Sequence, residues 1–197
     1  MSDDCQTRRR ILAAALKRFA DCGYAGASVQ DIVDAARVTK PTLYYYFSSK
    51  AKLYEALIDR AYDERLRLMR EAAGTADSLA EQLTEILTAL FEFLNHNRAL
   101  MRLAFATAFA APGEVPARLD CLTKGWRNFE FLRTLIQRAR ARGRLNRLFS
   151  SRQLTLGIYG MMNLKIMEGL VTPSLKLTRR DAEHIVQLYL QGARRKP

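Results

Sequence analysis

Residues 39–50 read TKPTLYYYFSSK, and this stretch decides how the chain is expected to fold. Threonine is a good helix cap, and proline suits the first helical turn because its missing N–H has no partner there anyway. Thr39 and Pro41 therefore predict the start of a short helix. Leu43 and Phe47 lie about one turn apart on it, so they share a face and are expected to be buried.

The tyrosine run in this stretch cannot be buried as a whole. Successive helical residues point about 100° apart, so Tyr44, Tyr45 and Tyr46 cannot all face one core. At least one phenol ring must be exposed, with Lys40 at the amino end of the same helix. Exposed hydroxyls and amines on a helix are typical of a surface that contacts phosphate.

A second short helix is expected directly before this one. Ser28 begins SVQD, which has the layout of a capping box, and apolar residues follow it at helical spacing up to Ala36. A first helix is expected over residues 6–22, where Gly23 is a natural stop. Three short helices with a tight turn between the second and third form the layout of a helix-turn-helix.

The outward residues of the third helix suit the major groove of DNA. Lysine and threonine side chains can meet base edges or phosphates, and tyrosine hydroxyls donate to phosphate oxygens. Lys50 opens the next helix, where the helix dipole favours a phosphate, and Arg37 is expected to add a phosphate contact. The alternative is that the tyrosines are half-buried packing residues of a small helical domain. The predicted DNA-binding residues are Arg37, Thr39, Lys40, Pro41, Thr42, Tyr44, Tyr45, Tyr46 and Lys50.

Helical periodicity continues along the remaining chain, and strand-like alternation is essentially absent. A helix over residues 50–73 precedes the composition break GTADS, so we expect it to connect two domains. The fold class is therefore predicted to be all-α with about nine helices, divided into residues 1–49 and 50–197. The last five helices are expected over residues 79–94, 98–110, 115–142, 152–170 and 179–193.

The charge balance indicates the kind of partner. Lys and Arg number 32 against 20 Asp and Glu, which gives a formal net charge of +12. A balance this basic favours nucleic acid as the partner, and an anionic membrane surface is the second candidate. The alternative is a basic soluble protein that binds no polyanion. Residues 124–147 concentrate many of these cations against the single acid Glu130. We expect a solvated face there, with DNA or an acidic ligand as the alternative.

Other classes of protein receive little support. Three scattered cysteines without CxxC argue against disulfides and metal binding, and they fit a cytoplasmic protein. No stretch has a signal-peptide layout or the roughly 20 apolar residues of a membrane span, so no membrane partner is expected. No catalytic motif is present around the two histidines. We therefore expect no enzyme, no cofactor and no metal, with a small helical hydrolase as the remote alternative.

Residues 28–57, SVQDIVDAARVTKPTLYYYFSSKAKLYEAL, resemble the amino-terminal domain of TetR-type transcriptional repressors. The resemblance covers about residues 8–55. Val33 and Arg37 depart from the pattern, which has a small residue and a glycine at these positions. A left-handed backbone at a non-glycine residue costs about 1 kcal/mol. The matching residues are Ile32, Ala35, Ala36, Val38, Thr39, Thr42, Leu43, Tyr44, Tyr46, Phe47, Lys50 and Leu53.

The resemblance implies a homodimer built from the last two helices and a cavity for a small, largely apolar inducer in the larger domain. For both residue sets, an ordinary intramolecular core is the alternative. The predicted dimer residues are Leu154, Ile158, Met161, Lys165, Ile185, Leu188, Tyr189 and Gly192. The predicted ligand residues are Phe91, Arg102, Phe105, Phe109, Trp126, Phe129, Tyr159, Met162, Asn163 and Met167.

Together these patterns predict a dimeric repressor that binds double-stranded DNA at a palindromic operator and is released by the inducer. The alternative is a basic, sequence-nonspecific, nucleoid-like DNA-binding protein. The two differ in preference for a palindrome, which should reach about 10³ or more for the repressor.

Overall fold

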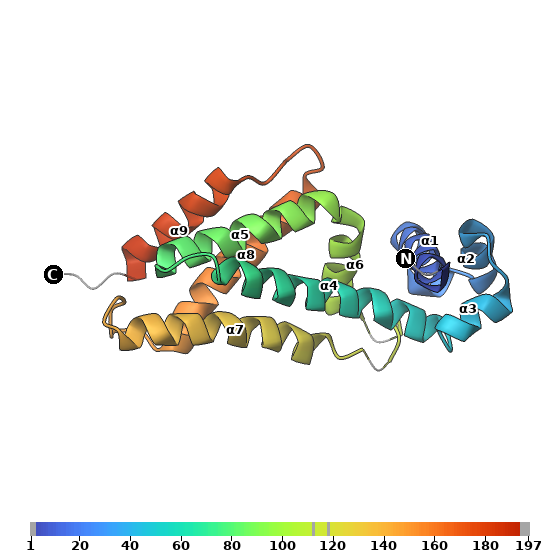
Figure 1. Cartoon of the computed structure of the whole chain (residues 1–197), viewed down its shortest axis with the longest axis horizontal. Helices are drawn as coiled ribbons and strands as arrows, with labels where there is room; N and C mark the ends of the chain where they lie inside the picture. The colour runs from blue at the N-terminus through green and yellow to red at the C-terminus, as the bar shows by residue number, and fades with distance from the viewer. Residues whose placement is uncertain (1–2, 112, 118, 194–197) are drawn as a thin grey trace. The chain divides into compact units, whose positions relative to one another are not determined.

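A computed structural model describes residues 3–111, 113–117 and 119–193. Within these ranges the chain forms nine α-helices and no β-strand, so the predicted all-α class is confirmed (Figure 1). The helices are α1 (Asp3–Gly26), α2 (Val29–Ala36), α3 (Lys40–Tyr46), α4 (Lys50–Ala73), α5 (Leu79–His96), α6 (Arg98–Ala108), α7 (Cys121–Ala141), α8 (Ser151–Val171) and α9 (Arg179–Ala193).

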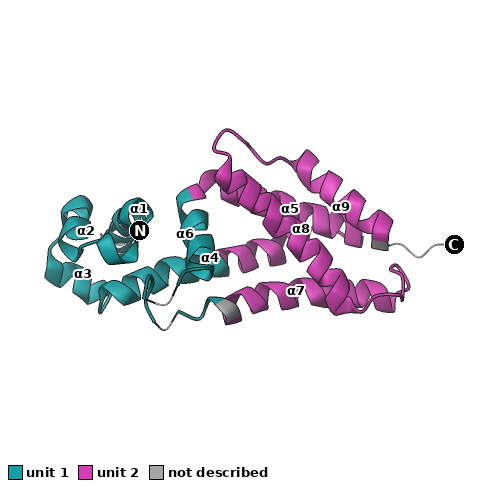
Figure 2. Ribbon diagram, turned by 180° about the vertical axis from the view of Figure 1, so that it is seen from behind, with its two compact units in different colours: residues 1–62, 99–122 teal, residues 63–98, 123–197 magenta. Residues whose placement is uncertain are grey.

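The helices group into two compact units, which Figure 2 colours separately. Unit 1 comprises residues 1–62 and 99–122, and unit 2 comprises residues 63–98 and 123–197. The predicted boundary at residue 49 separates functional domains, and it stays a prediction.

Unit 1 is built on the packing of α1 against α2 and of α2 against α3. Ile11, Ala15 and Phe19 lie one turn apart on α1, and all three are buried with Leu53 and Leu57 of α4. This is the amphipathic spacing expected of a helix that covers a core. The helical path of α1 breaks at a glycine with φ 70° and ψ 178°, which is the stop that the sequence predicts after residue 22.

Unit 2 is held together by α5, α8 and α9, which pack on one another. Asn95 on α5 clamps the segment before α9: its amide donates to the Leu177 carbonyl at 2.8 Å and its oxygen accepts from the Leu177 N–H at 3.3 Å. Arg98 donates to the carbonyl of Gly169 at 2.6 Å. These side chains satisfy backbone groups that no helix pairs.

The predicted helix over residues 115–142 is wrong at its start, because α7 begins at Cys121. Pro116 disfavours helical backbone at the residue before it, and Gly113 has a left-handed φ of 95°. Periodicity alone did not reveal this. Ser78 caps α5, where it forms a complete capping box with Glu81.

Candidate nucleic-acid interface

A left-handed residue makes the turn between α2 and α3. Ser28 caps α2 by accepting from the Asp31 N–H at 3.0 Å. At the other end Arg37 adopts φ 53° and ψ 51°, and its N–H donates to the Asp34 carbonyl at 3.1 Å. Thr39 then caps α3 within two residues. The positive φ predicted at Arg37 is therefore present, and the turn is tight without a glycine.

Two large apolar side chains anchor α3 to the unit. Leu43 and Phe47 are buried, as are Ile32 and Val33 on α2. The guanidinium of Arg8 lies 5.2 Å from the centre of the Phe47 ring. The anchoring fixes which side of α3 faces away from the core.

The opposite side of α3 is exposed. Lys40 and Pro41 are exposed at its amino end, and Tyr45 is the most exposed of the run, with 79% of its surface accessible. Tyr44 is also exposed. Thr42 is half-buried, and its hydroxyl shares a 2.8 Å hydrogen bond with that of Thr39. This face presents one amine, one methyl-bearing hydroxyl and two phenols, which are the groups that contact bases and phosphates.

Tyr46 plays a different part from its two neighbours. Its hydroxyl donates to the carboxylate of Asp4, and its ring meets that of Tyr45 edge-on at 5.1 Å. The contact with Asp4 brings the start of α1 next to the end of α3. The exposed Arg9 and Arg10 lie on that same first part of α1. They form a basic flank, which the prediction missed although the sequence clusters Arg8, Arg9 and Arg10.

Lys50 fastens the loop before α2. Its ammonium donates to the carbonyls of Tyr24 at 2.9 Å and Ala27 at 3.0 Å. It also lies 4.5 Å from the centre of the Tyr24 ring. Two of its three donor protons are thus engaged inside unit 1. Its predicted phosphate contact stays a prediction, and the structure adds a supporting role that no sequence signal reveals.

Residues 11–57 match the family profile described as "Bacterial regulatory proteins, tetR family". The chain carries a TetR-family amino-terminal domain. The predicted resemblance is confirmed for this part of the chain.

Two relatives of the chain are named as transcription regulators. It is 34% identical over 119 residues to the HTH-type transcriptional activator FasR of Mycolicibacterium smegmatis, covering 60% of this chain and 54% of FasR. It is 32% identical over 98 residues to the HTH-type transcriptional repressor KstR2 of the same organism, covering 50% and 48%. The chain thus spans about half the length of the relatives it matches. Neither relative is named as an enzyme.

The likeness in fold extends beyond this amino-terminal domain. The fatty acid degradation regulator FadR from Bacillus halodurans superposes with a TM-score of 0.82. The two chains are 20% identical, and the match covers 96% of this chain and 97% of FadR. At this identity the likeness shows the fold alone.

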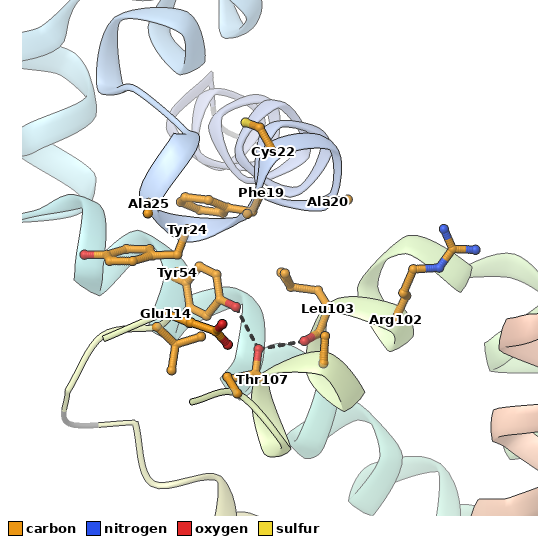
Figure 3. A pocket seen from close by; sticks show the side chains of 14 residues that line it. Phe19, Ala20, Cys22, Tyr24, Ala25, Tyr54, Arg102, Leu103, Thr107 and Glu114 are labelled. Carbon is orange, nitrogen blue, oxygen red and sulfur yellow. Dashed lines mark hydrogen bonds between the residues drawn. The ribbon is translucent and has the colours of Figure 1, made fainter. Parts of the chain in front are cut away.

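Unit 1 contains a pocket of about 420 Å³ (Figure 3). The pocket lies among the end of α1, the first part of α4 and α6. Its aromatic walls are Phe19, Tyr24 and Tyr54, whose rings meet at 4.9 to 6.1 Å. Tyr54 and Thr107 share a hydrogen bond of 2.7 Å on its floor, and burial raises the pKa of the Tyr54 phenol.

Polar groups in this pocket are few. Thr107 donates to the Leu103 carbonyl at 2.6 Å, so the Tyr54 hydroxyl is the donor between the two and keeps free acceptor capacity. Arg102 and Glu114 are the charged residues of the lining, and Figure 3 shows the Arg102 guanidinium directed away from the Tyr54–Thr107 pair. An apolar pocket with few polar groups is the general form of a small-molecule site.

The structure does not gather the predicted ligand residues in one place. Arg102 alone among them lines the unit 1 pocket, while Phe109 is exposed on the same unit. In unit 2, Phe91, Phe129 and Met162 are buried in the core. The remaining predicted ligand residues either contact other residues or are exposed to solvent. That the predicted set binds a ligand stays a prediction.

Asn163 illustrates these contacts in unit 2. Its amide oxygen accepts from Arg65 at 3.0 Å, and its amide nitrogen donates to the Tyr159 carbonyl at 2.8 Å. The Tyr159 hydroxyl donates to the Gly125 carbonyl at 3.4 Å, and its ring lies edge-on to that of Phe129 at 5.6 Å. These groups join helices of the unit, which is the core role that the sequence left open.

The predicted dimer residues divide between the core and the surface. Leu154, Ile158 and Tyr189 are buried inside unit 2, so the intramolecular alternative describes them. Lys165 pairs with Glu168 at 2.9 Å and Asp181 at 3.4 Å. The half-buried Met161 and Ile185 and the exposed Leu188 and Gly192 complete the set.

A different row of α8 is exposed and apolar. Its residues recur every three or four positions, and Leu164 at its centre is 69% accessible. Helix α8 is thus apolar on two sides, one packed in the unit and one open. We call this second side the α8 row: Leu156, Gly160, Leu164, Met167 and Val171.

Among the described residues, no group of three or more His, Cys, Asp or Glu side chains is placed to hold a metal ion. No helix in this part of the chain is long and apolar enough to cross a membrane.

Proposed function

We propose that the chain is a transcriptional regulator that inserts α3 into the major groove of an operator. The single observation that carries the proposal is the division of α3 into two faces. Leu43 and Phe47 are buried, while Lys40, Pro41 and Tyr45 are exposed beside a tight turn. Thr42 and Lys40 would meet base edges, and the exposed phenols would hold phosphates.

The proposed regulator acts as a homodimer, because a two-fold protein can read two half-sites about one helical turn or more apart. The α8 row supports this assembly, together with Leu188 of α9, which is also exposed. A contiguous exposed apolar face is typical of an interaction site. Two such helices from each copy would form a four-helix bundle.

The proposed regulator also responds to a small, largely apolar effector that releases the operator. The unit 1 pocket supports this step, since its volume of about 420 Å³ lies within the usual range for small-molecule sites. Release requires that the effector bind the DNA-free arrangement more tightly than the DNA-bound one. A nearly complete switch needs about 10⁴-fold differential affinity.

Selection from random duplex DNA tests the proposal. The full chain should enrich a palindrome and bind it about 10³-fold or more tightly than a scrambled duplex of equal length. A Thr42→Ala variant should enrich a changed base at one position of each half-site. If no motif is enriched and every duplex binds equally, the chain is a sequence-nonspecific basic protein and the proposal is wrong.

A further inference from the structure

The segment joining α7 to α8 carries a charge surplus that the proposed function does not use. Residues 131–167 contain no Asp or Glu. Only the outer cations of this region are compensated: Arg133 pairs with Glu130 at 2.6 Å, and Lys165 pairs with Glu168. The exposed cations between them have no acidic partner within the described part of the chain, and they are Arg138, Arg142, Arg144, Arg147 and Arg152.

The joining segment is fixed at both ends. Gly143 has φ 71° and its N–H donates to the Arg140 carbonyl, while the Arg144 N–H donates to the Ala139 carbonyl, both at 3.0 Å. This pair of bonds is a Schellman motif that ends α7. Ser150 starts α8 with a capping box. Hydrogen bonds therefore fix the backbone at both ends of the segment.

The segment also runs back along α7. The Arg147 carbonyl accepts from Arg140 at 3.4 Å, and the Arg152 guanidinium lies 5.9 Å from the ring of Trp126, a residue in the first half of α7. Leu145, within the segment, is buried. The cations thus line an elongated strip beside the helix.

Apolar side chains are exposed in the same strip. Leu148 is 81% accessible, and Phe149 beside it and Trp126 are exposed as well. A DNA backbone offers Leu148 no apolar surface to bury. A bilayer does, because aromatic and aliphatic side chains insert at the headgroup level while cations attract anionic lipids.

We propose that this strip binds the surface of an anionic lipid bilayer. Its members are Trp126, Arg142, Arg144, Arg147, Leu148, Phe149 and Arg152. The arginines face the headgroup phosphates, and the Leu–Phe pair enters the boundary with the acyl chains. The proposal replaces the expectation of no membrane partner, which rested on the lack of a spanning segment. Peripheral binding needs no such segment.

The only tryptophan of the chain lies in the strip and supplies the measurement. Full-length protein is titrated with vesicles of phosphatidylglycerol and phosphatidylcholine, or of phosphatidylcholine alone. We expect the Trp126 emission to shift to shorter wavelength and to be quenched by brominated acyl chains with the anionic vesicles only. Vesicle flotation gives the partition coefficient independently. No shift and no flotation would overturn the proposal.

Three variants locate the binding. Arg142→Gln/Arg144→Gln/Arg147→Gln should lower the partition coefficient about 100-fold, since each cation near an anionic surface contributes about five-fold. Leu148→Ser/Phe149→Ser should lower it about ten-fold or more. The matched control Arg60→Gln/Arg70→Gln/Arg180→Gln removes the same charge from exposed sites elsewhere and should change it by less than about two-fold, because salt screens distant charges.

Four results contradict the proposal. The first is a control variant that lowers the partition coefficient as much as Arg142→Gln/Arg144→Gln/Arg147→Gln does. The second is unchanged binding by Leu148→Ser/Phe149→Ser. Loss of affinity for scrambled duplex DNA with intact vesicle binding would make the strip a nucleic-acid surface instead. Circular dichroism checks folding, and Leu148→Ser alone should still lower partitioning if a larger variant unfolds. If Leu148→Ser is folded and its partition coefficient is unchanged, the proposal is also wrong.

Discussion

Arg37 holds a backbone conformation that glycine adopts with less strain. With φ 53° it closes the turn between α2 and α3, and its side chain is exposed. The exposed guanidinium at this position is available for a contact outside the unit. The proposed contact is a DNA phosphate.

Replacing Arg37 separates these two effects. Arg37→Gly should raise the free energy of unfolding by about 0.5–1 kcal/mol in urea titrations, because the left-handed strain disappears. It should also lower the salt slope of operator binding by about one. The matched control Arg37→Ala loses the same charge but keeps the strain, so it should share only the second effect. Equal slopes for wild type and both variants would exclude a phosphate contact.

Lys50 provides the second residue-scale test. Lys50→Met leaves the carbonyls of Tyr24 and Ala27 without their donor, so unfolding should become easier by about 1–3 kcal/mol. Lys52→Met, two positions along on the exposed side of α4, should cost little because its pair with Glu55 lies on the surface. Unchanged stability in Lys50→Met would mean that the lysine serves DNA alone.

Helix α3 has one buried face and one solvent-exposed face, so its exposed tyrosines can be replaced without destabilising unit 1. Tyr45→Phe should leave stability unchanged and weaken binding to every duplex by about five-fold, as expected for one lost phosphate hydrogen bond. Tyr46→Phe loses its bond to Asp4 instead and should mainly lower stability. Filter binding and thermal unfolding distinguish the two. A change in base preference with Tyr45→Phe would contradict its positioning role.

Helix α8 packs closely on the rest of unit 2 at Gly169. A Cβ there would lie 2.9 Å from a methyl of Leu94 and 3.3 Å from one of Leu177, and both leucines are buried. Gly169→Ala should therefore lower the free energy of unfolding by about 1–3 kcal/mol. Gly157→Ala, whose Cβ would meet the Tyr189 ring at an ordinary 3.6 Å, should raise it by about 0.5–1 kcal/mol. If both variants change the free energy of unfolding by similar amounts in the same direction, the core around Gly169 can rearrange to accept a methyl group.

At the scale of the whole molecule, the exposed side of α8 decides the proposed assembly. Leu164→Glu places a charge in the centre of the α8 row, so sedimentation should detect a monomer where the wild type forms a dimer. Its affinity for a palindrome should fall at least about 100-fold, because the half-sites then bind separately. Thr134→Glu, an equally charged change on exposed α7, should stay dimeric. A dimeric Leu164→Glu variant would place the interface elsewhere.

The parts of the molecule that local chemistry determines could be predicted from the sequence. The tight turn at Arg37 and the caps at Ser28 and Ser78 depend on neighbours within a few residues. The open face of α8 could not be predicted in this way. Leu154 and Ile158 on one side and Leu156 and Leu164 on the other are both apolar at helical spacing, so periodicity does not tell the buried side from the exposed one.

The pocket and the role of Lys50 depend on contacts between distant parts of the chain. Tyr54 meets Thr107 across 53 positions, and Lys50 reaches back 26 positions to the carbonyl of Tyr24. No spacing rule connects such residues. The predicted ligand residues were chosen by residue type along separate helices, and they divide between the two units.

Lys50 has a consequence for how the gene tolerates change. Its ammonium recognises main-chain oxygens, which every amino acid carries, so the side chains at its acceptors can drift without penalty to the bond. A saturation mutagenesis screen should therefore find one intolerant codon with no compensating partner. Statistical searches for paired substitutions would therefore not detect the hydrogen bonds between Lys50 and these two carbonyls.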